Sequence, residues 1–228
     1  ILRGPQGTLY GRNTLGGAIN LISQRPNGSG VETKLTLGNY GLTQAQFTTD
    51  FEIADGTYGK LVVNSKERDG YVHNAPGPYG GAQGVVPSAD PTVNELDTIN
   101  SHGFRFTIAR DTDKSSFDLS VDYNDQSNTP PFAQLGYTIP NWSAAFGVGA
   151  SPATGGLKLW PIELYTSKGR AKVAHVNEAV FEKSEVSGVA LTYSRDTNLG
   201  TVKAILARRD TEWSDNLDLD GGPFPIAN

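Results

Sequence analysis

Hydrophobic and polar residues alternate along several stretches of this chain. The clearest alternation runs from 115 to 124, where every second residue is apolar: Phe117, Leu119, Val121 and Tyr123. The residues between them are polar: Asp118, Ser120, Asp122 and Asn124. A period of two is typical of a β-strand whose two faces have different surroundings. Similar patterns predict further strands near residues 33–37, 44–53, 57–68, 104–109, 189–194 and 201–213.

The two faces of the strand near 201–213 cannot be assigned from the sequence. Apolar residues occupy both alternating rows between Val202 and Ala207, and the pair Arg208-Arg209 interrupts either row. A strand is therefore predicted here without a prediction of which side chains share a face.

The connections between the predicted strands alternate between short and long. The short ones are Ala54–Gly56, Asp111–Lys114 and Asp196–Gly200, and the long ones are Ala75–Asn100 and Gln126–Glu182. In an antiparallel meander this order places all the short turns at one end. Outer-membrane barrels have such short turns on one side and long loops on the other. A tilted spanning strand needs about 9–11 residues, and 44–53 and 115–124 are of this size.

The alternation alone leaves the surroundings of the apolar face open. In a soluble sheet the apolar face packs on a core, whereas in a wide membrane barrel it meets lipid and the polar face meets the lumen. The segregation of short and long connections favours the barrel, because a soluble sandwich has no reason to separate them.

Composition narrows the class of protein further. The chain has 228 residues, no cysteine, 27 glycines and a formal net charge of −5. The absence of cysteine excludes disulfides and thiolate metal sites. No basic stripe is present, so nucleic acid is not an expected partner. No run of 18 apolar residues occurs, which excludes a transmembrane helix.

Motifs for catalysis or metal binding are incomplete. Gly11 and Gly16 have the spacing of a phosphate-binding loop, but Gly17 stands where that loop needs a lysine. Asn216, Asp218 and Asp220 match the opening of a calcium loop, but Ala227 replaces its bidentate glutamate. His175 and Glu178 lie three residues apart without a clear helix. We therefore predict no catalytic residues, no metal site and no cofactor.

The first 26 residues carry the most specific motif. They contain Leu2-Arg3-Gly4-Pro5, Leu9-Tyr10-Gly11 and Gly16-Gly17-Ala18-Ile19-Asn20, followed by Arg25-Pro26. This segment closely resembles the end of the plug domain of TonB-dependent outer-membrane receptors. The run Arg68-Asp69-Gly70-Tyr71, together with Asn74, resembles the third-strand region of the same family. The short apolar run 18–23 predicts one buried strand in the plug.

The resemblance implies an all-β fold: the C-terminal end of a plug domain, residues 1–28, followed by antiparallel meander strands of an incomplete transmembrane β-barrel, residues 29–228. It also implies a plug motif of Arg3, Gly4, Pro5, Tyr10, Gly11, Gly16, Gly17 and Asn20. Arg3, Tyr10, Gly16 and Gly17 are expected to be buried in the plug and against the barrel wall. The connector 27–30, Asn-Gly-Ser-Gly, marks the boundary.

The same resemblance implies a function and a location. The whole receptor would import a scarce nutrient, such as an iron–siderophore complex, a cobalamin or an oligosaccharide, across the outer membrane of a Gram-negative bacterium. Its partners would be the outer-membrane lipid, the nutrient and a TonB-type energy-transducing protein, which would bind a box upstream of Ile1. The chain is therefore expected to be an internal fragment, and not an enzyme.

Aromatic residues of the long segment after 126 are candidates for contact with the ligand: Phe132, Tyr137, Trp142 and Trp160. They are equally able to pack the loop on itself, since long loops of compact proteins are often functional but need their own packing. The alternative to the receptor is a soluble or surface β-rich module for ligand binding or adhesion. Such a module would not need the opening motif.

Overall fold

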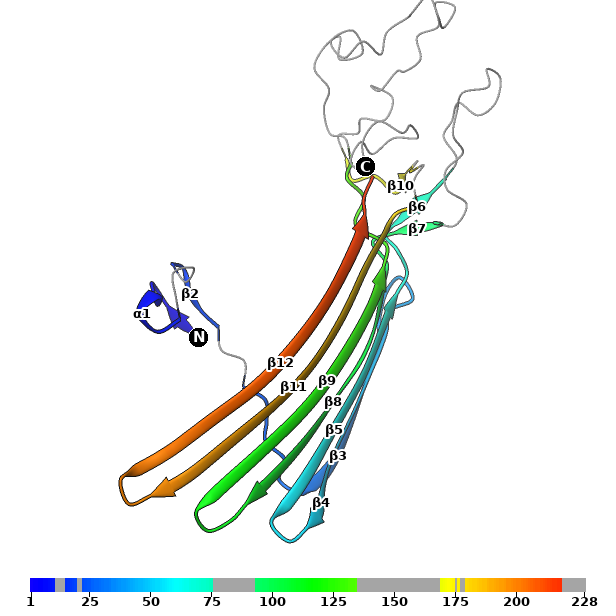
Figure 1. Cartoon of the computed structure of the whole chain (residues 1–228). Helices are drawn as coiled ribbons and strands as arrows, with labels where there is room; N and C mark the ends of the chain where they lie inside the picture. Colours follow the sequence, from blue (N-terminus) through cyan, green and yellow to red (C-terminus); the bar gives the residue numbers. More distant parts are fainter. Residues whose placement is uncertain are drawn as a thin grey trace, which may run out of the picture.

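The computed structural model describes residues 1–10, 15–19, 22–75, 93–134, 169–174, 176 and 179–218. Seven strands form one antiparallel sheet: β3 (Ser29–Leu37), β4 (Thr43–Ala54), β5 (Thr57–Arg68), β8 (Ile99–Asp111), β9 (Ser115–Asn128), β11 (Phe181–Thr197) and β12 (Gly200–Asn216). In space they lie in sequence order, with β3 and β12 as the two edges. Figure 1 shows them as one long, curved sheet.

Six smaller elements complete the described chain. They are β1 (Leu2–Arg3), α1 (Gly7–Tyr10), β2 (Gly17–Ala18), β6 (Val72–Asn74), β7 (Glu95–Leu96) and β10 (Val173–Ala174). β1 and β2 pair near the N-terminus, while β6 and β7 of the β5–β8 connection form a three-stranded sheet with β10 of the β9–β11 connection. None of the described residues belongs to a helix that is apolar and long enough to span a membrane.

The meander predicted from the connections is confirmed. The turns β4–β5, β8–β9 and β11–β12 all lie at the same end of the sheet (Figure 1), and the long connections β5–β8 and β9–β11 lie at the other. We call these the short-turn end and the long-loop end. The turn between β3 and β4 also lies at the long-loop end, because it is at the opposite end of β4 from the short β4–β5 turn.

The two faces of the sheet follow the alternation in the sequence. Leu119 of β9 lies opposite Leu191 of β11, which lies opposite Leu206 of β12, so three leucines form a row across three strands. All three are exposed, at 38%, 38% and 70%. Their immediate neighbours along the chain face the other side. We call the leucine side the apolar face and the opposite side the polar face.

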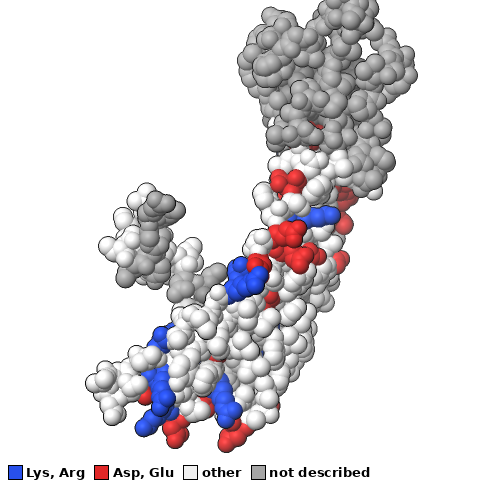
Figure 2. Space-filling model, in the orientation of Figure 1, with Lys and Arg blue, Asp and Glu red and all other residues white. Residues whose placement is uncertain are grey.

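Two aromatic pairs lie on the apolar face, one toward each end of the sheet. Phe117 contacts Tyr193 toward the short-turn end, with 4.7 Å between ring centroids. Phe104 lies near Tyr123 toward the long-loop end, with 6.2 Å between centroids. On the surface shown in Figure 2, the middle of the sheet is largely free of charge, while charged side chains gather toward its two ends. An apolar band edged by aromatic residues is the surface expected of a barrel in a membrane.

The register assigns the faces of β12 that the sequence left open. Ala204 and Leu206 lie opposite Tyr193 and Leu191 and so belong to the apolar face. Arg209 lies on the polar face, opposite Gly188. Its Nη2 donates to both carboxylate oxygens of Asp122, at 3.1 and 2.9 Å, on the far side of β11. A side chain at Gly188 would obstruct this pair, since its Cβ would lie 2.9 Å from the Arg209 guanidinium.

The described part of the opening segment differs from the predicted strand. In place of one buried strand over 18–23, the described residues there form only the short strand β2, and Ile19 and Ile22 are 72% and 85% exposed. No described residue covers these two side chains, so burial of this run in the complete receptor stays a prediction. Arg3 and Gly16 are likewise exposed, and Gly17 is half-buried.

Candidate functional site

The connector between the opening segment and β3 lies on the polar face at the short-turn end. Asp50 of β4 accepts hydrogen bonds from the backbone N–H groups of Asn27 and Gly28, at 3.0 and 2.8 Å. Its other oxygen lies 3.4 Å from the Lys60 ammonium group, and Lys60 donates to the Gln24 side chain at 3.1 Å. The Asp50 side chain is only 6% exposed. A buried charge needs such partners, so Asp50 fixes the place where the connector meets the sheet.

Arg25, two residues before the connector, makes a second attachment to the polar face. Its guanidinium donates two hydrogen bonds to Asp111, at 2.6 and 2.9 Å, and one to Asp118, at 2.5 Å. The pKa of Arg25 is raised above its usual value, chiefly by the hydrogen bond to Asp111, while partial burial opposes the shift. Since the three side chains are about one third to one half exposed, each pair contributes about 1 kcal/mol at most.

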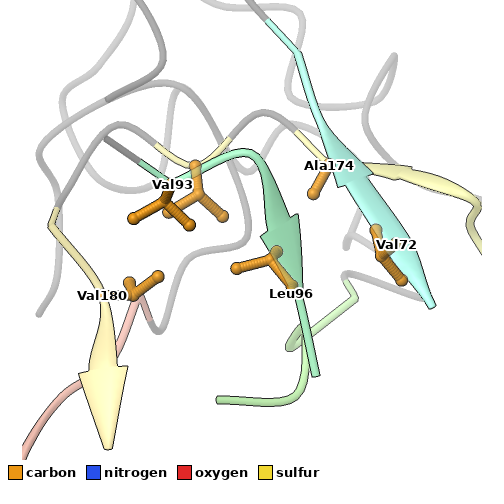
Figure 3. Close-up of a cluster of buried hydrophobic side chains, with 6 residues drawn as sticks. Val72, Val93, Leu96, Ala174 and Val180 are labelled. Atoms are coloured by element: carbon orange, nitrogen blue, oxygen red, sulfur yellow. The ribbon is translucent and has the colours of Figure 1, made fainter. Parts of the chain in front are cut away.

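A small apolar cluster forms at the opposite, long-loop end. Its buried members come from both long connections: Val72, Val93, Leu96, Ala174, Val176 and Val180. Five of them are labelled in Figure 3, where the side chains gather around β7. β10 pairs in parallel with β6, and β6 pairs with β7. The described parts of the two long connections are therefore packed and hydrogen-bonded as one unit.

Asn74 is the buried polar residue that joins the two connections. Its side-chain oxygen accepts from the backbone N–H of Val176 at 2.9 Å, and its amide nitrogen donates to the carbonyls of Val93 and Val176 at 2.9 and 3.3 Å. Only 6% of the residue is exposed. Each of these backbone groups would lose its partner if the side chain were removed.

We expect Asn74→Ala to loosen the long-loop end without unfolding the sheet. An unsatisfied buried polar group costs about 1–3 kcal/mol. Hydrogen exchange at the amides of Val176 and Ala75 should accelerate, while exchange in β8 and β9 stays slow. Asn39→Ala, in the exposed β3–β4 hairpin, is the control and should change neither. Unchanged exchange at Val176 in the Asn74 variant would contradict the role given to this residue.

Tyr71, at the start of the β5–β8 connection, packs against the β3–β4 hairpin. Its ring meets Tyr40 edge-on at 4.6 Å between centroids, and the guanidinium of Arg68 lies 3.8 Å from its centre. Arg68 also forms an ion pair with Asp97 at 3.2 Å. Gly70 packs closely against β7: a Cβ at this position would lie 2.3 Å from the backbone carbonyl oxygen of Leu96, so no larger residue fits. The Arg68–Tyr71 run, singled out in the sequence, thus organises the start of the long-loop end.

A pocket of about 450 Å³ opens beside this cluster. Its apolar lining comes from β7, from the segment after β9, from the segment before β11 and from β12: Leu96, Pro130, Pro131, Phe132, Ala133, Val176, Val180, Trp213 and Leu217. The charged residues that line it in the described part of the chain are Glu182, Asp215 and Asp218. Trp213 lies opposite Ser184 in the register. Trp213, Glu182 and Asp215 consequently share the polar face with Arg209.

The structure places only one of the predicted ligand contacts. Phe132 lines the pocket and packs against the apolar cluster; Tyr137, Trp142 and Trp160 lie outside the described residues. Sequence analysis did not identify Trp213, Glu182 or Asp215, because the faces of β12 were unassigned and the pocket joins segments distant in the chain.

The predicted plug motif is described in part. Arg3 pairs with Gly17 in the β1–β2 ladder, Gly4 has a positive φ of 84°, and Pro5 is exposed. Gly11, Asn20 and the side chain of Tyr10 lie outside the described residues. Gly17 has a φ of 135°, and a Cβ there would lie 2.4 Å from the Leu2 carbonyl oxygen. Gly16 has no atom within 4 Å of such a Cβ.

Among the described residues, no group of three or more His, Cys, Asp or Glu side chains is arranged to hold a metal ion. His175, Glu178 and Asp220, which the sequence offered as partial motifs, lie outside the described residues.

Comparison with known proteins gives structural neighbours only. No family model matches the sequence, and no curated protein matches it. Among solved structures, the ferric yersiniabactin uptake receptor FyuA of Yersinia pestis superposes with a TM-score of 0.62 at 18% identity, over 93% of this chain and 28% of FyuA. The chain has the fold of part of a siderophore receptor.

Two further receptors agree with this assignment. The ferric-catecholate import receptor Fiu of E. coli K12 gives a TM-score of 0.61 at 18% identity, over 94% of this chain and 26% of its own. The siderophore receptor PiuA of Acinetobacter baumannii gives 0.55 at 15% identity, over 92% and 26%. The chain thus spans little more than a quarter of the length of these neighbours.

The siderophore-receptor fold confirms the all-β class and, at the level of the fold, the resemblance carried by the opening segment. The neighbours are outer-membrane receptors of Gram-negative bacteria, in agreement with the predicted location. They are transport receptors and not enzymes, which is consistent with the prediction that this chain catalyses no reaction.

Proposed function

We propose that the protein to which this chain belongs imports a ferric chelate across the outer membrane, with energy supplied by a TonB-type protein of the inner membrane. Residues 1–28 would be the end of the plug and residues 29–228 the first barrel strands. The names of the structural neighbours favour an iron–siderophore complex over a cobalamin or an oligosaccharide. The aromatic residues Phe132, Tyr137, Trp142 and Trp160 are the proposed ligand contacts.

One observation carries this proposal: the connector from the opening segment is attached to the polar face of the sheet, opposite the apolar band. Asp50 and Arg25 hold it there through five hydrogen bonds. In a barrel whose apolar face meets lipid, the polar face lines the lumen. The opening segment would then enter the lumen, where a plug belongs. A soluble module gains nothing from this attachment.

Gly17 and Gly7 offer a matched test of the plug assignment. Valine at Gly17 would need a φ that side chains rarely adopt and would collide with the Leu2 carbonyl, at a cost of about 1–3 kcal/mol from backbone strain alone. In the complete receptor, expressed in cells starved of iron and lacking other chelate receptors, Gly17→Val should reduce chelate uptake more than receptor abundance. Gly7→Val, outside the plug motif and with no atom within 4 Å of the added Cβ, should leave both nearly unchanged. Normal uptake at normal abundance for Gly17→Val would contradict the plug assignment.

A further inference from the structure

We infer that the pocket at the long-loop end selects a neutral or positively charged chelate and disfavours an anionic one. This inference rests on the proposed function, since it names the charge class of the imported compound. The residues that carry it are the opposed carboxylates of Glu182 and Asp215 and the apolar walls beside them.

The size and walls of the pocket suit a compact, partly apolar compound. Its volume of about 450 Å³ lies within the roughly 300–1,000 Å³ usual for small-molecule sites. Phe132, Val180, Trp213 and Leu217 contribute apolar surface from three separate segments. A ligand with hydrocarbon around a polar centre would therefore bury its outer atoms against this lining.

Glu182 of β11 and Asp215 of β12 lie directly opposite each other in the register of these two adjacent strands. Like charges in this position repel each other and destabilise the strand pair. In the part of the chain that the structure describes, neither carboxylate has an arginine, lysine or histidine within ion-pair distance. The other polar-face carboxylates named above do have such a partner: Asp50 pairs with Lys60, Asp118 with Arg25 and Asp122 with Arg209.

Among the described residues, the charged side chains that line the pocket are all acidic: Glu182, Asp215 and Asp218. A chelate with net negative charge would add to the repulsion between Glu182 and Asp215, whereas a cationic group between them would relieve it. The exposed indole of Trp213 adds an aromatic face, which also attracts cations. The same wall therefore favours one class of ligand and opposes the other.

Ferric chelates occur in both charge classes. Three catecholate groups around Fe³⁺ give a strongly anionic complex, whereas three hydroxamate groups give a neutral core, which a free amine makes cationic. These two complexes are similar in size, so they separate the effect of charge from that of shape. The amine-bearing ferric trihydroxamate and the ferric tricatecholate are the probes for the experiment.

The experiment uses the complete receptor in outer-membrane vesicles for binding and in iron-starved cells for uptake. The cationic trihydroxamate should bind at least tenfold more tightly than the tricatecholate. Glu182→Gln and Asp215→Asn should each weaken binding of the cationic probe by roughly tenfold, the usual size for a lost charged contact. Glu182→Lys should weaken it further and improve binding of the anionic probe.

Glu185→Gln is the matched control. It removes one negative charge three residues from Glu182 on the same strand, but the alternation places it on the opposite face of the sheet. It should alter the binding of neither probe, and equal effects of Glu185→Gln and Glu182→Gln would overturn the inference.

The outcomes separate the inference from the proposed function. Uptake of the cationic probe with the expected response to Glu182→Lys supports both. Uptake of the tricatecholate in preference to the trihydroxamate, or no response to the Glu182 and Asp215 variants, overturns the inference while import of a ferric chelate stands. Uptake of neither probe overturns both.

Discussion

Replacing Leu191 by arginine should strongly reduce the amount of folded barrel in the membrane. Leu191 is the middle of the row formed with Leu119 and Leu206 on the apolar face. If this face meets hydrocarbon, an arginine there costs about 2–4 kcal/mol near the bilayer midplane. The measurement is the fraction of complete receptor that resists unfolding when it is assembled into lipid bilayers.

Thr192→Arg is the control for this prediction. Thr192 follows Leu191 directly but lies on the polar face, between Asp118 and Ile205 of the neighbouring strands. An arginine there would have a carboxylate beside it and no contact with lipid, so assembly should be nearly normal. Equal losses for the two variants would contradict the assignment of faces, because neighbouring strand residues must point to opposite sides.

Removing the Asp50 carboxylate should give the largest loss of stability at the junction between the connector and the sheet. Asp50→Ala leaves the backbone N–H groups of Asn27 and Gly28 without their acceptor and Lys60 without its charge partner. The Lys60 side chain is only 12% exposed, and breaking a buried pair typically costs about 3–5 kcal/mol. Chemical unfolding of the complete receptor in detergent measures this change.

Asp113→Ala is the control for the Asp50 variant. It removes a carboxylate from the exposed β8–β9 turn and should change the unfolding free energy by less than about 0.5 kcal/mol. Protease cleavage near Gln24 should also become faster in the Asp50 variant alone. Wild-type stability and protection for Asp50→Ala would show that the connector is not fixed by this residue.

Strand order and most strand faces could be predicted from the sequence because they depend on local patterns. The alternation from Phe117 to Asn124 defines β9 by itself, and turn lengths define the meander. β12 was ambiguous for a physical reason: Arg208 lies on the apolar face and pairs there with Asp210, while Arg209 reaches Asp122 across Gly188. Such cross-strand pairing is invisible until the register is known.

The candidate site was less predictable because its residues are distant in the chain. Val72, Leu96 and Val176 form one cluster only after the two long connections meet, and no periodic pattern marks them. Asn74 stands in a run that resembles the receptor family, but its hydrogen bonds to Val93 and Val176 depend on the tertiary structure. The pocket likewise combines Phe132 with Trp213 from different strands.

The central claim is that the apolar face of the sheet meets lipid and the polar face meets the interior of a barrel. Because the chain has no cysteine, Leu191→Cys and Thr192→Cys in the complete receptor can each carry a single spin label. Collision with oxygen, which concentrates in hydrocarbon, should be frequent at position 191 and rare at position 192. A label at 191 that collides mainly with a water-soluble nickel chelate, or a label at 192 that reports hydrocarbon, would contradict the account.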